Sequence, residues 1–226
     1  MLVRTISRSI YGRSGAVFYS GRASFTTLCP IYILGLNPGG DPVRHSIFTV
    51  GLSIAKFLRR NIATWSAYTD EKWDRRSIQV RMVHLLSALG YNARVVPASN
   101  VVFVRTASES SLKAEKDALL RACWPFHSMV IQNLNVRLVL CLGKTAGCWA
   151  RKQLGANRLV DTFIERYPRL HRTSEVLASG IRVATLVHPA RCDWTNPLAD
   201  PTPMILRSLR LTLRQRIHMR RRRMQP

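Results

Sequence analysis

Polar residues that can hydrogen-bond a ligand follow three apolar segments of this sequence. They are Asn37 to Asp41 in the run Asn-Pro-Gly-Gly-Asp, the pair Ser99-Asn100, and the run His188-Pro-Ala-Arg191. An amide both donates and accepts hydrogen bonds, a carboxylate can accept a proton, and a histidine can exchange one near neutral pH. One such group would mean little, but three that converge would form a site able to bind a polar ligand and orient water.

The apolar segments before these groups predict strands that end where the polar residues begin. Residues 31–36, 137–142 and 181–187 are short apolar runs, and shorter strands are expected at 94–97, 101–104 and 176–178. Helical periodicity covers 48–60, 75–89 and 113–134. This alternation predicts an α/β fold, a three-layer α/β/α arrangement with a mostly parallel four-stranded central sheet and room for extra strands. Ligands bind beyond the carboxyl ends of such strands.

The charge of the chain predicts an anionic partner. Its 226 residues contain 35 Lys and Arg against 12 Asp and Glu, a net charge of +23, which is too large for an ordinary mixed surface. DNA, or alternatively RNA, would balance it through phosphate contacts. The alternative is that the charge lies in tails that only target the protein. Every apolar run is interrupted before it could span a bilayer, so we expect no membrane partner. We also expect the protein to be a monomer.

The two ends of the chain differ in composition from its middle. Residues 1–27 contain scattered arginines and no acid, which is typical of a mitochondrial presequence or of a basic arm on a bacterial protein of the cytoplasm or nucleoid. The expected domain covers residues 28–202, and the first 27 residues are expected to lie outside it. Residues 203–226 are rich in arginine and predict a helix or tail, which could contact DNA phosphates, lie on a membrane surface or stay exposed.

Neither a metal nor an organic cofactor is expected. The five cysteines form no Cys-x-x-Cys pair, which argues against zinc and iron–sulfur clusters. The run Gly143-Lys144-Thr145 resembles part of a nucleotide-binding loop, but the glycine required five positions before Gly143 is Leu138. That motif therefore fails, although Gly143 to Thr145 could still offer a helix N-terminus to a DNA phosphate.

Four segments together resemble the uracil-DNA glycosylase superfamily, in its branch without an iron–sulfur cluster. They read Leu-Gly-Leu-Asn-Pro-Gly-Gly-Asp-Pro at 34–42, Ser-Asn-Val-Val-Phe-Val-Arg at 99–105, Leu-Val-Leu-Cys-Leu-Gly-Lys-Thr-Ala at 138–146, and Leu-Val-His-Pro-Ala-Arg at 186–191. Each is weak alone, but they occur in the order of the family. The resemblance implies that fold and a monofunctional DNA glycosylase that hydrolyses the N-glycosidic bond of flipped uracil or a related deaminated base.

The resemblance also implies roles for individual residues. His188 would stabilise the negative charge that grows on the uracil O2, and Asn100 would read N3–H and O4 of the base. Asn37 stands where other branches have an acid; because an amide is no general base, it could only orient water, and a slow or selective enzyme is expected. Structural alternatives are a histidine satisfied at a strand end for His188 and a turn residue for Asn100.

The remaining site residues implied by the resemblance surround these three. Asp41 could take the acidic role or be a turn carboxylate, and Phe48 could stack on the base or belong to the core. Trp194 could insert into the base stack but is better explained by packing. The backbone at Gly35, Leu36, Pro38 and Gly39 would contact the base, and Lys144, Thr145 and Arg191 would contact DNA.

A catalytically silent nucleic-acid-binding protein of the same fold is the alternative, for example a component of an RNA–protein assembly. The missing motif acid and the high charge favour it.

Overall fold

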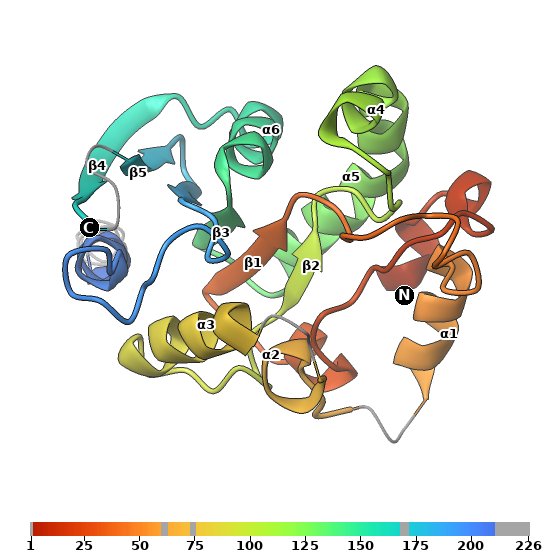
Figure 1. Cartoon of the computed structure of the whole chain (residues 1–226), viewed down its shortest axis with the longest axis horizontal. Coiled ribbons are helices and arrows are strands. Elements are labelled where there is room, and N and C mark those ends of the chain that lie inside the picture. The colour runs from red at the N-terminus through yellow and green to blue at the C-terminus, as the bar shows by residue number, and fades with distance from the viewer. Residues whose placement is uncertain (1, 60–62, 73–75, 168–171, 211–226) are drawn as a thin grey trace, which may run out of the picture.

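The chain is an α/β protein built on one six-stranded sheet (Figure 1). A computed structural model describes residues 2–59, 63–72, 76–167 and 172–210. The strand order is β2-β1-β3-β6-β5-β4; β2, β1, β3 and β6 are mutually parallel, whereas β5 and β4 are antiparallel to their neighbours. The strands are β1 (Ile31–Gly35), β2 (Ala98–Asn100), β3 (Leu138–Leu142), β4 (Arg158–Glu165), β5 (Arg172–Ala178) and β6 (Arg182–Leu186).

The sheet differs from the expected one in two respects. It has six strands rather than four, because β5 and β4 extend the four parallel strands at one end as antiparallel strands. Of these two, β4 was not expected, since it carries mostly exposed or half-buried residues and lacks an apolar run. The two strands expected at 94–97 and 101–104 are also wrong, because the strand lies between them at Ala98–Asn100. Residues 101–104 are buried all the same, packed into the core beyond the end of β2.

Helices cover both faces of the sheet. They are α1 (Val50–Leu58), α2 (Ala67–Asp70), α3 (Arg76–Ala88), α4 (Glu109–Ala114), α5 (Lys116–Asn133), α6 (Lys144–Leu154) and a helix at 202–210. The single helix expected over 113–134 is two helices, α4 and α5, separated at Glu115. Hydroxyl side chains cap three helices: Thr49 accepts from the Leu52 amide, Ser66 from that of Tyr68 and Ser108 from that of Ser111.

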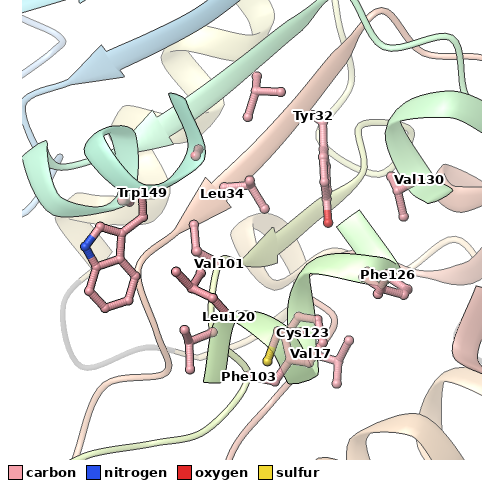
Figure 2. Packing of buried hydrophobic residues seen from close by; sticks show 14 of the residues in the cluster. Val17, Tyr32, Leu34, Val101, Phe103, Leu120, Cys123, Phe126, Val130 and Trp149 are labelled. Atoms are coloured by element: carbon pink, nitrogen blue, oxygen red, sulfur yellow. The ribbon is translucent and has the colours of Figure 1, made fainter. Parts of the chain in front are cut away.

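The alternation of side chains along β1 shows how the sheet separates two cores. Tyr32 and Leu34 face the core formed with α1, α5 and α6, while Ile31 and Ile33 face the core formed with α3 and the 202–210 helix. Figure 2 shows part of the first core, in which Tyr32 and Leu34 lie near residues of the 101–104 segment and of α5. A sheet buried on both faces explains why its central strands are almost entirely apolar.

Residues 2–27 are packed into this fold, unlike the arm that we expected to lie outside it. They contain three short 3-10 helices, and Figure 1 shows the segment running beside β2 and α1. Residues 15 and 18 bridge Val104 and Ser99, so the segment covers the outer edge of β2. Ile6, Ile10, Val17, Phe18 and Phe25 are buried, which is the physical reason that the segment docks. Cleavage of this segment stays a prediction.

The helix expected at the carboxyl end is present over residues 202–210. Met204 and Ile205 are buried against the sheet, and Arg207 pairs with Asp161 of β4. The arginines at 220–223 lie outside the described residues. Within the described part of the chain, no helix is both long and apolar enough to cross a lipid bilayer.

Candidate active site

The ends of the four parallel strands open into one cleft of about 1210 Å³. Ten of the twelve site residues expected from the sequence line this cleft: Gly35, Leu36, Asn37, Gly39, Phe48, Asn100, Lys144, Thr145, His188 and Arg191. Carboxyl ends of parallel strands share one edge of a sheet, so residues up to 156 positions apart meet there. The cleft is larger than a single base.

The side chain of Asn37 is held with its carbonyl oxygen left to accept a hydrogen bond. Its Nδ2 donates to Thr106 Oγ1 at 3.3 Å, to Pro38 O at 3.3 Å and to Val104 O at 3.5 Å. These partners occupy the donating end of the amide, so Oδ1 is the end that can accept from a water molecule. No carboxylate is among the hydrogen-bond partners of Asn37.

Asn100 and Gly35 form one structural unit. The two residues are register partners on β2 and β1, and a Cβ on residue 35 would lie only 2.1 Å from Asn100 Oδ1. The absence of a side chain at Gly35 therefore lets the Asn100 amide reach across β1. Asn100 is buried, and its Nδ2 makes no hydrogen bond of normal geometry with a protein atom. A buried donor in that state is unusual unless a water or ligand satisfies it.

The Tyr19 hydroxyl lies beside the Asn100 amide. Burial raises the pKa of Tyr19, while the neighbouring Asn100 side chain acts to lower it. Tyr19 therefore stays a neutral phenol, and it is a polar neighbour that limits the orientations open to the Asn100 amide. Tyr19 belongs to the segment that sequence analysis excluded from the domain, and nothing in its surroundings marked it as part of a site.

His188 is fixed as a neutral hydrogen-bond donor. The Ala190 amide donates to its Nδ1 at 3.1 Å, so the proton of the neutral ring is on Nε2. Burial, with a further contribution from Arg191, lowers the pKa of His188, which keeps the ring neutral at physiological pH. Gly143, at φ 104°, turns β3 into α6 next to the His188 ring, and its amide donates to Leu186 O at 2.8 Å.

Phe48 lies at the rim of the cleft and not in the core. Its side chain is 43% exposed, it precedes α1, and Lys56 Nζ lies 5.7 Å from its ring centroid. An exposed ring with a cation beside it is suited to stacking on a nucleobase while the cation attracts phosphate. Phe48 therefore does not belong to the core, which was the structural alternative for this residue.

The N-terminus of α6 already carries a negative group. Thr145 Oγ1 donates to Glu109 Oε1 at 2.8 Å, and Lys113 Nζ lies 3.1 Å from the same oxygen. These two contacts lower the pKa of Glu109, so its carboxylate is ionised at neutral pH. Glu109 and the exposed Lys144 and Arg191 line the same side of the cleft. Sequence analysis missed Glu109, which lies in no motif.

Three of the residues considered lie away from the cleft. Asp41 is exposed, and its Oδ1 accepts from the Val43 amide at 2.8 Å, so it is a turn carboxylate outside the cleft. Pro38 is buried behind the loop and does not line the cleft. Trp194 is fully buried in the core beside α3, which confirms its packing role and leaves it unable to insert into nucleic acid.

Three further charged residues in the cleft were not expected. Arg59 follows α1, Glu71 follows α2, and Arg105 follows the 101–104 segment; all three line the cleft. Burial lowers the pKa of Arg105, whose Nε lies 3.3 Å from Ser14 Oγ. Arg105 closes the second family-like segment, but its place in the cleft depends on the N-terminal segment that packs beside it.

Among the described residues, no group of three or more His, Cys, Asp or Glu side chains could hold a metal ion. Neither a scan against protein-family models nor a search of the curated proteins found a match to this chain. The cleft and its side chains are therefore what any functional assignment depends on.

Proposed function

We propose that the chain is a monofunctional DNA glycosylase that hydrolyses the N-glycosidic bond of uracil or a related deaminated base. The observation that carries the proposal is the neutral His188, whose Nε2–H is fixed by the Ala190 amide in the same cleft as Asn37 and Asn100. A neutral donor held in place suits an oxygen on which negative charge develops as the bond breaks. The uracil-DNA glycosylase variety of the α/β fold belongs to the same proposal.

In the proposed reaction the three polar side chains act on different atoms. His188 Nε2–H donates to O2 of the departing base, and Asn37 Oδ1 accepts from the attacking water. Asn100 accepts from N3–H and donates to O4, a pattern that cytosine cannot return. Phe48 stacks on the flipped base. The bond from C1′ to the base nitrogen breaks, water oxygen bonds to C1′, and the water proton leaves to solvent or to the base.

The proposed partner is DNA, bound through cations of the cleft. Its lining includes Lys56 and Arg59 at the end of α1, Lys144 at the start of α6, and Arg191. Together with the net charge of +23, they would attract a phosphate backbone and make binding strongly dependent on salt. This attraction is independent of the chemistry at His188.

A single-turnover assay of base release tests the proposal. Oligonucleotides with uracil, hypoxanthine or xanthine, single-stranded and double-stranded, are incubated with an excess of protein. We expect release of one of these bases, lowered about 100- to 1,000-fold by His188→Ala with little change in affinity. His84→Ala is the matched control, because His84 pairs with Asp200 and does not line the cleft. No release by the unmodified protein, or equal loss in both variants, would refute the proposal.

A second candidate is a catalytically silent binder of the same fold, and one observation favours it. Glu71 and Glu109 are the carboxylates that line the cleft among the described residues, and neither bonds to Asn37. If hydrolysis requires a general base, the cleft can only hold a nucleotide. Tight, salt-sensitive binding without release of any base would select this candidate.

A further inference from the structure

The connection between β1 and α1 (Figure 1) carries apolar side chains at residues 42–48, which we call the ridge. Its Phe48 lines the cleft, while Pro42, Val43 and Ser46 line a second hollow of about 530 Å³. The side chains of Val43 and Ile47 are 78% and 73% exposed. Exposed apolar side chains four residues apart, in a segment that reaches a binding cleft, are suited to a contact surface.

The ridge is held in place by hydrogen bonds. The Val43 amide donates to Asp41 Oδ1 at 2.8 Å, and the Ser46 amide donates to Val43 O at 3.2 Å. The N-terminal segment anchors it as well, since Ser14 Oγ donates to His45 O at 2.9 Å. Val43 and Ile47 are therefore presented by a fixed turn, and a partner would meet them at little cost in conformational entropy.

The charges around the ridge favour nucleic acid as the occupant. Arg44 stands between the two apolar residues in the sequence; its side chain is 86% exposed, and its Nε lies 3.9 Å from Asp41 Oδ2. That ion pair is long, so the guanidinium keeps nitrogens that can meet a phosphate, and Lys56 Nζ lies over the Phe48 ring. Apolar side chains next to exposed cations match an unpaired nucleotide, which presents an apolar base face and a phosphate. A paired duplex would hide its base faces from Val43 and Ile47, so the surface fits single-stranded nucleic acid.

We propose that this ridge binds the unstacked bases that neighbour the nucleotide in the cleft, and that it makes the protein prefer single-stranded over duplex DNA. The inference rests on the nucleic-acid partner of the proposed function, but it does not rest on base hydrolysis. Val43 and Ile47 supply contact with base faces, whereas Arg44 supplies contact with a phosphate. The two contributions respond differently to salt.

Equilibrium binding of a uracil-free oligonucleotide, single-stranded or in a duplex, tests the proposal without any turnover. We expect the double variant Val43→Ala, Ile47→Ala to bind the single strand about tenfold or more weakly, with an unchanged salt slope and with its duplex affinity unchanged. Arg44→Ala is expected to reduce the salt slope by about one. Leu28→Ala is the matched control, because Leu28 is 71% exposed and precedes β1. It therefore lies near the amino end of that strand, whereas the cleft lies at the carboxyl ends of the parallel strands.

Several outcomes would overturn the proposal. If the Val43→Ala, Ile47→Ala variant binds the single strand as tightly as the unmodified protein does, the ridge does not contact nucleic acid and would fit a protein partner instead. A loss of affinity of the same size in Leu28→Ala would lead to the same conclusion. Equal weakening on single strand and duplex would remove the claimed preference. Because none of these measurements uses uracil, the absence of base release by the unmodified protein would refute the glycosylase proposal separately.

Discussion

His127 makes the stability of this fold sensitive to acid. It is fully buried on α5, and its Nε2–H donates to Val101 O at 3.1 Å, because a carbonyl can only accept. Nδ1 therefore accepts from the Tyr32 hydroxyl at 2.8 Å. A second proton on the ring would have to enter a dry core and break this arrangement. Val101 follows Asn100, so the same ring supports the strand end that carries a cleft residue.

The size of the effect follows from the pKa of His127. Burial lowers it to about 3, whereas a histidine in an unfolded chain titrates at about 6.5. Between those values the unfolded chain binds a proton that the folded chain does not, so acidification favours unfolding. His127 alone should lower the free energy of unfolding by about 2 kcal/mol from pH 7 to pH 5. The stabilisation is present above pH 6.5 and is lost as the pH falls towards 3.

Urea unfolding at several pH values, followed by tryptophan fluorescence, measures this effect. The comparison protein is His127→Gln, which keeps a polar side chain but cannot titrate. The free energy of unfolding of His127→Gln should be lower at every pH. Between pH 7 and pH 5, however, it should fall by about 2 kcal/mol less than that of the unmodified protein. The acid response of His188 is common to both proteins and cancels. Parallel losses in the two proteins would refute the argument that His127 is buried and neutral.

Three further predictions concern the cleft. Gly35→Ala puts a Cβ where Asn100 Oδ1 lies, so base release should fall about 100-fold and the preference for uracil over cytosine should weaken; oligonucleotides with each base measure this. Glu109→Gln removes the negative charge beside Thr145, so the affinity for DNA should rise about fivefold at low salt, as measured by fluorescence anisotropy. Asp41→Asn should leave single-turnover release unchanged, and a large loss would contradict its position outside the cleft.

The convergence of the polar loops was predictable because it depends on a rule of parallel sheets. Short apolar runs at 31–36, 137–142 and 181–187 predict strands, and their carboxyl ends must share an edge. The pairing of Gly35 with Asn100 was not predictable in the same way. It depends on the register of two strands 65 residues apart, and on an amide that crosses a residue without a side chain.

The N-terminal segment shows how composition can mislead. Scattered arginines without acids are shared by targeting peptides and by any basic segment that docks on a core. What distinguishes this segment is the burial of Ile6, Ile10, Val17 and Phe18, whose partners are on β2, α1 and α5 and cannot be seen locally. Because Tyr19 and Arg105 reach the cleft through the same packing, the error about the segment also hid those two residues.

The contacts around Asn37 and His188 indicate where the proposed enzyme would obtain its rate. Asn37 can orient water but cannot remove its proton, and no carboxylate bonds to it. His188 is a neutral donor fixed by the Ala190 amide, so it needs no reorganisation when charge develops on the base. The proposed reaction thus depends more on stabilising the leaving base than on activating water. Such an enzyme would favour bases that leave readily as anions, which is a property that favours uracil over cytosine.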